Sequence, residues 1–378
     1  MATIAGSAST GPSCAKPRET PRVNPYMHAR SSGVARGARP EGTVLGYGPG
    51  EPGAANDVRR RRTPAPPAGS RCRRGARVSI PILNASGCLD ALTAPGVAAQ
   101  LDAFVTKTVT PLAREGNPPP RIAETEAGML NAIGLQNPGI DAFLEQHLPC
   151  LAVLGAPLWV SVGGFSGRDY AAICERLDPE ESIAVLELNL SCPNVEEAPE
   201  TAAELVAVAR GVTTKPVYAK LSPATRDIAE SARAVADAGA DGLSLVNTIR
   251  GFSLDPRTRR PTLAHGVGGY SGPALRPIAL ACVYACAEAV DLPIVGMGGI
   301  ASGDDARDVV SAGASAVALG TILFSDPLAP SRIRAELASS ELAPAAASGR
   351  DIHGLGRDSG FRPVSSAGQT TQKALQMG

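Results

Sequence analysis

Residues 184–194 read AVLELNLSCPN, a stretch whose first half is mostly apolar and whose end is polar. The apolar half is typical of a parallel strand buried on both faces. Pro193 has no backbone N–H to donate to a sheet, so the strand is expected to end near Cys192. A parallel α/β barrel carries its chemistry at the carboxyl ends of its strands. Cys192, between Asn189 and Asn194, is therefore a candidate acid–base or nucleophilic residue, with a buried structural thiol as the alternative.

Apolar runs of this kind recur from residue 79 onward and alternate with alanine-rich helical patterns, which indicates repeated strand–helix units. Eight strands are expected, at 80–84, 103–107, 158–162, 184–190, 217–221, 242–247, 293–297 and 315–320. Helices fit between most of them, for example at 201–212, 225–239, 273–290 and 303–312. Eight units over about 250 residues predict a (β/α)8 TIM barrel. A doubly wound sheet would carry a glycine-rich dinucleotide turn after its first strand, and the sequence has none.

Three segments lie outside the simple repeat. Residues 108–157 form a long insertion after the second strand, and their apolar content predicts an ordered segment that folds over the barrel mouth. Residues 1–78 are rich in Gly, Pro, Ser and Arg, lack a hydrophobic period, and are expected to be a disordered leader. Residues 340–378 are expected to be a disordered tail. The barrel domain is therefore predicted at 79–339.

The charge of the chain is unevenly distributed. Residues 1–78 hold 14 of the 36 basic and 4 of the 36 acidic residues, which leaves 22 basic and 32 acidic residues in the body. A mildly acidic body argues against a nucleic-acid surface on the folded part. No apolar stretch is long enough to span a bilayer without interruption. The eight cysteines form no CxxC motif, which fits a reducing cytoplasm, and neither they nor the four histidines show metal-ligand spacing.

Three glycine-containing pairs are expected to end late strands, namely Ser271-Gly272, Gly298-Gly299 and Gly320-Thr321. In barrels, the loops after the last two strands commonly bind a phosphate, because glycines let backbone N–H groups approach the oxygens and a helix N-terminus follows. Each pair alone is an ordinary turn, but together they favour a phosphate site. Because no long dinucleotide motif accompanies them, a mononucleotide such as FMN is a candidate source of the phosphate.

Two lysines, Lys107 and Lys220, are expected to end strands at the same mouth. A lysine at a strand end ordinarily extends to solvent or pairs with a carboxylate. With Asn189 and Asn247 at other strand ends, the pair of lysines favours a site for an anionic ligand and for a cofactor that gains negative charge. A reduced flavin is such a cofactor.

A set of motifs that runs in family order across residues 80–335 resembles the class 1 dihydroorotate dehydrogenases. The motifs are ASG at 85–87, VTKTVT at 105–110, REGNPPPR at 114–121, ETEAGMLNAIGLQNPG at 124–139, NLSCPN at 189–194, KLSP at 220–223, DGLSLVNT at 241–248, GVGGYSGPA at 266–274, GMGGI at 296–300 and ALGT at 318–321. The sequence around GNPPPR and GMLNAIGLQNPG is most similar to the NAD-linked (class 1B) subgroup.

The resemblance implies a dihydroorotate dehydrogenase that oxidises dihydroorotate to orotate in de novo pyrimidine synthesis, with hydride transfer to one FMN per chain. In the subgroup, the catalytic FMN subunit pairs with an electron-transfer subunit that carries FAD and a 2Fe–2S cluster and passes electrons to NAD. The cysteines of this chain form no set for such a cluster. A homodimeric core, a cytoplasmic location and the absence of a metal site are also implied.

Carried over by position, the resemblance implies that Cys192 removes the C5 proton of dihydroorotate while the C6 hydride passes to the flavin, and that Lys220 stabilises the reduced flavin. The implied substrate-binding residues are Lys107, Asn131, Ala132, Ile133, Gly134, Leu135, Asn189, Asn194, Asn247 and Thr248. The implied cofactor-binding residues are Ala85, Ser86, Gly87, Lys107, Thr108, Asn189, Lys220, Val246, Ser271, Gly272, Gly298, Gly299, Gly320 and Thr321.

The sequence departs from the family pattern at a few places. After NLSCPNVEE the family usually carries a longer segment with further glycines, whereas APETAAEL follows here. Ser161 stands where the family often has a flavin-contacting Asn, and Ala224 where an Asn often follows KLSP. Two alternatives remain open: a related flavin barrel that acts on dihydropyrimidines, against which Asn194 argues, and an FMN-binding protein whose catalysis is impaired by the shortened segment.

Overall fold

The computed structural model describes residues 79–190 and 201–339. The predicted leader and tail lie outside the described residues, as do Cys192 and Asn194. Their assignments therefore stay predictions.

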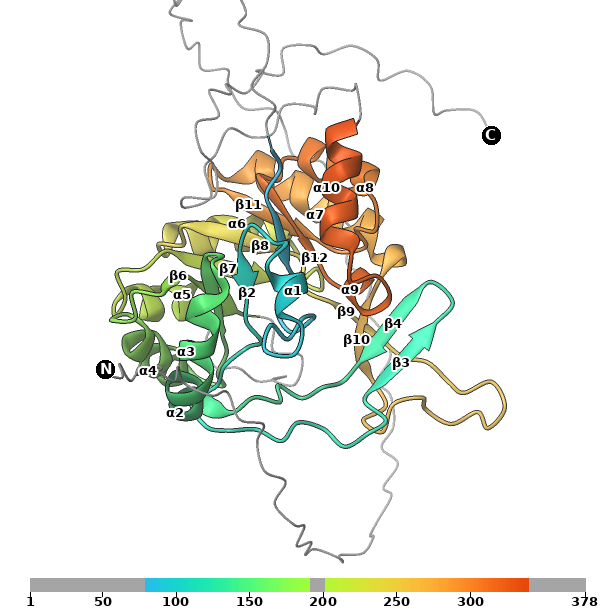
Figure 1. Ribbon diagram of the computed structural model, residues 1–378, viewed down its shortest axis with the longest axis horizontal. Coiled ribbons are helices and arrows are strands. Elements are labelled where there is room, and N and C mark those ends of the chain that lie inside the picture. Colours follow the sequence, from blue (N-terminus) through green and yellow to red (C-terminus); the bar gives the residue numbers. More distant parts are fainter. Residues whose placement is uncertain (1–78, 191–200, 340–378) are drawn as a thin grey trace, which may run out of the picture. The chain divides into compact units, whose positions relative to one another are not determined.

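Eight parallel strands form one sheet in the order β1-β12-β11-β8-β7-β6-β5-β2. These strands are β1 (Ile82–Asn84), β2 (Phe104–Val105), β5 (Leu158–Val162), β6 (Ile183–Asn189), β7 (Val217–Leu221), β8 (Gly242–Leu245), β11 (Ile294–Met297) and β12 (Ala316–Leu319). A parallel bridge between Leu83 and Ala103 joins the two end strands. The sheet therefore closes on itself, which confirms the predicted (β/α)8 TIM barrel (Figure 1).

Helices follow the barrel strands and pack in sequence against one another. The longer ones are α4 (Gly167–Leu177), α5 (Ala202–Arg210), α6 (Ile228–Asp237), α7 (Arg276–Ala289), α8 (Gly303–Ser311) and α10 (Ala329–Ser339). Short helices are α1 (Pro95–Ala98), η3 (Pro273–Leu275) and α9 (Ile322–Ser325). Thr201 and Glu204 form a capping box at α5, and the Asp227 carboxylate accepts backbone N–H groups at the start of α6. None of the helices that the structure describes could cross a membrane.

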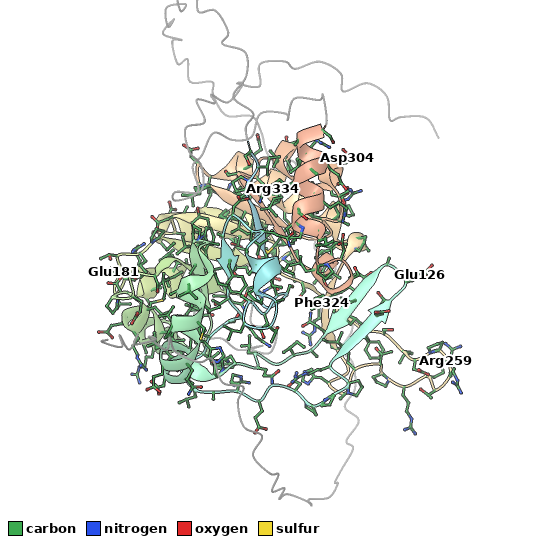
Figure 2. All side chains as sticks on the ribbon, viewed as in Figure 1. Glu126, Glu181, Arg259, Asp304, Phe324 and Arg334 are labelled. Carbon is green, nitrogen blue, oxygen red and sulfur yellow. The ribbon has the colours of Figure 1, made fainter. Side chains whose placement is uncertain are left out.

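The long insertion after β2 folds into a hairpin followed by short helical turns. Its elements are β3 (Ile122–Thr125), β4 (Gly128–Asn131), α2 (Gly139–Ala142), η1 (Phe143–His147), α3 (Leu148–Leu151) and η2 (Ala152–Leu154). The hairpin joins β9 (Ile249–Gly251) and β10 (Gly268–Ser271) in an antiparallel sheet of order β3-β4-β10-β9. Glu126 at the hairpin turn and Arg259 in the β9–β10 connection both project away from the barrel (Figure 2).

Close contact between β4 and β10 depends on glycine. A Cβ atom added at Gly128 would lie 2.1 Å from the Ser271 carbonyl oxygen, so a larger residue there would push the two strands apart. The antiparallel sheet was not expected from the sequence. Ser271-Gly272 ends β10 of this second sheet, so the expectation that this pair follows a barrel strand was wrong.

The barrel interior is filled by large and small side chains from facing strands. Trp159 of β5 and Tyr218 of β7 lie fully buried with 4.6 Å between ring centroids. The Tyr218 ring fits because Gly242 of β8 has no side chain, since a Cβ there would come within 2.3 Å of the ring. Side chains alternate along each strand, so the next interior positions toward the mouth are Glu187 and Lys220. The core below the mouth is thus solid, and polar groups begin above it.

Candidate active site

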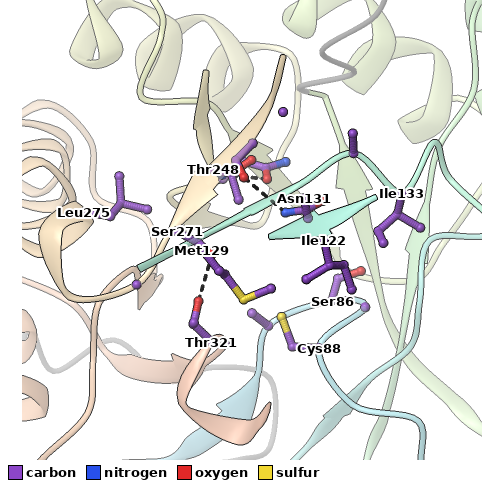
Figure 3. Close-up of a pocket in the computed structure, with 18 of the residues that line it drawn as sticks. Ser86, Cys88, Ile122, Met129, Asn131, Ile133, Thr248, Ser271, Leu275 and Thr321 are labelled. Carbon is purple, nitrogen blue, oxygen red and sulfur yellow. Dashed lines mark hydrogen bonds between the residues drawn. The ribbon is translucent and has the colours of Figure 1, made fainter. Parts of the chain in front are cut away.

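A cavity of about 890 Å³ lies at the carboxyl ends of the barrel strands, with residues of the antiparallel sheet on its other side (Figure 3). All described members of the two predicted residue sets line it. Those from the predicted substrate set are Lys107, Asn131, Ala132, Ile133, Gly134, Leu135, Asn189, Asn247 and Thr248. Those from the predicted cofactor set are Ala85, Ser86, Gly87, Lys107, Thr108, Asn189, Lys220, Val246, Ser271, Gly272, Gly298, Gly299, Gly320 and Thr321. The fold therefore gathers these residues in one place, while their individual roles stay predictions.

A row of amides and hydroxyls crosses the cavity between β8 and β2. Asn247 Nδ2 donates to Asn189 Oδ1 at 3.1 Å, and Asn189 Nδ2 donates to Thr108 Oγ1 at 3.3 Å. Asn247 Oδ1 accepts the backbone N–H of Thr248 at 2.8 Å, and Tyr170 Oη donates to the Asn189 carbonyl oxygen at 2.7 Å. Because each group is held by a neighbour, the row is fixed in orientation and suits a planar ligand with carbonyl and N–H groups.

A second set of hydroxyls braces the wall under Thr108. Ser161 Oγ lies 3.0 Å from Thr108 Oγ1, and the Ser161 backbone N–H donates to Thr106 Oγ1 at 3.1 Å. Ser86 Oγ donates to the Thr106 carbonyl oxygen at 2.9 Å. Thr108 lines the cavity and Ser161, which is fully buried, does not. The serine at this position therefore supports the wall through Thr108, instead of facing the cavity.

The two lysines occupy different environments. Lys220 Nζ lies 3.3 Å from Glu187 Oε1, and the two side chains are 6% and 1% exposed. Lys107 lies two residues after β2 and is open to the cavity. Desolvation lowers the pKa of Lys107, Arg121 lowers it further, and Asp90 opposes both. An anion bound beside Lys107 would favour its charged form and so raise this pKa.

The turns after β11 and β12 have the geometry of an anion cradle. Gly298 and Gly299 have φ values of +123° and +76°, which side chains rarely adopt. The backbone N–H groups of Gly299, Gly320 and Thr321 donate to no residue that the structure describes, and these three residues line the cavity together with Gly298. Backbone donors without acceptors at the last two barrel strands are typical of a phosphate site.

Thr321 connects this cradle to the second sheet. Its hydroxyl donates to Ser271 Oγ at 2.9 Å, which is drawn in Figure 3. Ser271 therefore reaches the cavity from β10 and meets the turn after β12. Ser271 and Gly272 line the same cavity as the two barrel turns, although they belong to a different sheet.

Several cavity residues carried no functional assignment from the sequence. Apolar residues that line the cavity are Ile122, Met129, Leu275, Met297, Ile300 and Ile322. Three arginines, Arg114, Arg121 and Arg250, also line the cavity, as does His265. Cys88 also lines it, and burial raises the pKa of the Cys88 thiol against an opposing effect of Lys220. The motifs contain several of them: Arg114 and Arg121 lie in REGNPPPR, Met129 in ETEAGMLNAIGLQNPG, and Met297 and Ile300 in GMGGI, but the motifs alone assign them no role.

These features fit FMN. The apolar lining residues and the amide row suit a flat ring with polar edges, the two glycine turns supply free N–H groups for a phosphate, and Lys220 supplies positive charge. The cavity volume lies in the range of small-molecule and cofactor sites. Among the residues that the structure describes, no group of three or more His, Cys, Asp or Glu side chains could hold a metal ion.

Comparison with known proteins decides the family. Residues 74–340 match the family model described as dihydroorotate dehydrogenase. The chain belongs to the dihydroorotate dehydrogenase family. The dihydroorotate dehydrogenase B (NAD(+)) catalytic subunit of Anoxybacillus flavithermus is 45% identical over 279 residues, which cover 70% of this chain and 88% of that protein. The subunit of the same name from Geobacter metallireducens is 45% identical over 273 residues, covering 70% of this chain and 90% of that protein.

One solved structure has a fold similar to that of this chain. The crystal structure of DHODH from Eimeria tenella in complex with ferulenol superposes with a TM-score of 0.58 at 23% identity, covering 68% of this chain and 80% of that chain. The predicted resemblance to class 1 dihydroorotate dehydrogenases, nearest to the NAD-linked subgroup, is thereby confirmed.

Proposed function

We propose that this protein is a dihydroorotate dehydrogenase that oxidises dihydroorotate to orotate in de novo pyrimidine synthesis, with FMN bound in the barrel mouth. The observation that carries the proposal is the single cavity in which all described members of the predicted substrate and cofactor sites meet. The family match over 74–340 and the NAD(+)-type relatives favour this substrate over dihydropyrimidines.

FMN supplies the hydride acceptor when it is bound. The phosphate is assigned to the turns at Gly298-Gly299 and Gly320-Thr321, because the N–H groups of Gly299, Gly320 and Thr321 have no acceptor among the described residues. The Lys220 ammonium is assigned to the ring, where it offsets the negative charge that reduction brings. Separate regions of one cavity thus hold the two ends of the cofactor.

The pyrimidine ring of the substrate is assigned to the amide row. Asn189 and Asn247 present fixed donors and acceptors, Thr248 extends the row, and Asn131 faces it from β4. Lys107 supplies a positive charge for the substrate carboxylate. Orientation by several fixed groups would place the reacting carbon beside the flavin ring.

Cys192 is assigned the role of the base that removes the C5 proton. The residue lies outside the described part, but β6 ends at Asn189, which lines the cavity only three residues earlier. A thiol with an ordinary pKa of ~8.5 needs help to act as a base near neutral pH. A neighbouring positive charge supplies such help.

The electron acceptor is assigned to a partner. The relatives are named catalytic subunits of an NAD(+)-dependent enzyme, and that name implies a second subunit. We assign FAD and a 2Fe–2S cluster to this electron-transfer subunit, a homodimeric core to the barrel, and a cytoplasmic location to the assembly.

Anaerobic mixing of the FMN-loaded chain with dihydroorotate tests the function. The flavin absorbance is expected to bleach, and Cys192→Ser is expected to slow bleaching by about 100-fold or more while FMN stays bound. Cys282→Ala on α7, which does not line the cavity, is the matched control and is expected to keep the rate. A flavin that stays oxidised with dihydroorotate would refute the activity and favour an FMN-binding protein without catalysis.

A further inference from the structure

An ion pair lies buried inside the barrel, next to the cavity floor. Glu187 of β6 and Lys220 of β7 approach to 3.3 Å, and both side chains are almost completely shielded from solvent. Within 79–190 and 201–339 they are the only buried residues that carry a full charge. The pair therefore dominates the electrostatics of the barrel interior.

The two partners differ in their access to the cavity. Lys220 lines the cavity and Glu187 does not. Lys220 pairs in register with Asn189, and Glu187 precedes Asn189 by two residues on the same strand, which places it one interior position further from the mouth. Glu187 therefore contacts the Lys220 ammonium on the side away from the cavity. It can affect a bound ligand only by changing the position or the net charge of Lys220.

The neighbouring strands add no further charge. Register places Ser161 of β5 beside Glu187 and Ser244 of β8 beside Lys220. The Ser161 hydroxyl is already bonded to Thr108, and the buried Ser244 hydroxyl has no hydrogen-bond partner among the described residues. Tyr218, the register partner of Glu187, is uncharged. Glu187 is thus the counter-ion that sets the net charge around Lys220.

Stability gives a weak reason for such a pair. Replacing a buried ion pair by apolar side chains is often neutral or stabilising, because the Coulombic attraction barely offsets the loss of hydration. A ligand that changes its charge beside the pair gives a stronger reason. A fixed ammonium favours the charged form of that ligand, and the carboxylate behind it decides by how much.

We propose that Glu187 is a positioning residue of the flavin site: it holds the Lys220 ammonium at the cavity floor and offsets part of its positive charge, and so sets how strongly the site favours reduced, negatively charged flavin. The inference rests on the proposed function, because it needs FMN in the cavity. It assigns a role to a residue that touches neither cofactor nor substrate.

Two properties of the FMN-loaded full chain test the inference. One is the midpoint potential of the bound FMN, and the other is the dissociation constant for sulfite, which adds to oxidised flavin and leaves the ring negatively charged. In Glu187→Gln, Lys220 faces an uncharged amide, so the net charge of the pair at the cavity floor becomes positive. The potential is expected to move to more positive values, and the sulfite dissociation constant to fall by about threefold or more. Lys220→Gln is expected to shift both properties in the opposite direction.

Glu181→Gln is the matched control. It removes the same charge from an exposed position six residues earlier, on the outer surface of the molecule (Figure 2), and is expected to leave both properties unchanged. If Glu187→Gln does not hold FMN, Glu187→Asp is measured instead, and its withdrawn carboxylate is expected to give smaller shifts of the same sign. Unchanged values, or shifts of the opposite sign, in an FMN-loaded variant would overturn the inference. A wild-type chain that takes up no FMN would instead refute the proposed function.

Discussion

The two halves of the barrel wall differ in the side chains that they place in the interior near the mouth. The half formed by β5, β6, β7 and β8 contributes the polar residues Ser161, Glu187, Lys220 and Ser244. The half formed by β11, β12, β1 and β2 is mainly apolar there: it contributes Met297, Ala318 and Leu83, and Val105 of β2 lies one layer lower, level with Trp159. In the apolar half, β11 and β12 are followed by the glycine turns at Gly298-Gly299 and Gly320-Thr321.

This difference explains how one barrel can bind both the ring and the phosphate of a cofactor. A ring that changes charge needs fixed charges and dipoles close by, which the β5–β8 half supplies. A phosphate keeps its charge and needs backbone N–H groups that approach closely, which small residues and glycine turns allow. Each half is therefore built for a different ligand group, and each can be altered separately.

Loss of the ammonium in the polar half is expected to have the largest effect. Lys220→Gln removes the positive charge at the cavity floor, so the rate of flavin reduction by dihydroorotate should fall by about 100-fold, as measured by anaerobic stopped-flow absorbance. Glu187→Gln combined with Lys220→Gln avoids a lone buried carboxylate and is expected to show the same loss. Met297→Leu, in the apolar half, should stay within about threefold of the wild-type rate. Equal losses in the two halves would break the comparison.

A methyl group in the glycine half is expected to act on cofactor affinity. Gly299 has a φ of +76°, and a Cβ there would lie 2.9 Å from the backbone nitrogen of Arg276. Gly299→Ala strains this turn, so the FMN dissociation constant should rise by about tenfold in a titration of the apoprotein.

Gly211→Ala is the control for this change. Gly211 has a φ of −67°, and its nearest neighbour to an added Cβ lies at 3.5 Å, so FMN affinity should not change. If Gly299→Ala leaves the FMN dissociation constant unchanged, the assignment of the phosphate to this half of the barrel is wrong.

The smallest effect on ligand binding is expected at Lys107. This residue follows β2, the strand that pairs with β5 of the polar half. Burial lowers the pKa of Lys107, and a bound anion favours the charged form. Orotate affinity should therefore decrease as pH rises through this lowered pKa, starting below the ~10.4 of an ordinary lysine. The orotate affinity is expected to fall a few-fold, which is about the effect of one charge in a partly hydrated site. Titration of the flavin absorbance with orotate measures this affinity at each pH.

Two variants assign this pH dependence. Lys107→Gln should bind orotate more weakly at neutral pH and lose the Lys107 component of the decrease. Arg121→Gln removes a group that lowers the pKa of Lys107, so the decrease should move to higher pH. A wild-type pH profile in both variants would show that another group titrates.

The barrel was predictable because its strands are buried on both faces and so read as apolar runs. The strand expected at 184–190 is β6 at Ile183–Asn189, and the strand expected at 217–221 is β7 at Val217–Leu221. The antiparallel sheet was not predictable, because its strands are short, half-exposed and rich in glycine. Its order depends on pairs such as Gly269 with Asn131, which no local pattern records.

The site was predictable as a set of residues more than as a set of contacts. Motifs placed Asn189 and Asn247 in one mouth, and the structure adds the hydrogen bond between them. The contact of Glu187 with Lys220 could not be predicted, since a glutamate within a strand has no sequence signal for its partner 33 positions away. Strand register and barrel closure create this contact.

Trp159 is the only tryptophan of the chain, and its ring packs at a tilt against Tyr218 in the closed interior below the mouth. All indole fluorescence of the protein therefore arises from one buried position. Indole emission overlaps the absorption band of oxidised flavin, so energy transfer should quench this emission as the cavity fills. The same signal would report exposure of the barrel interior during unfolding. The chain thus contains an intrinsic optical probe of both cofactor occupancy and barrel integrity, at a site that needs no label.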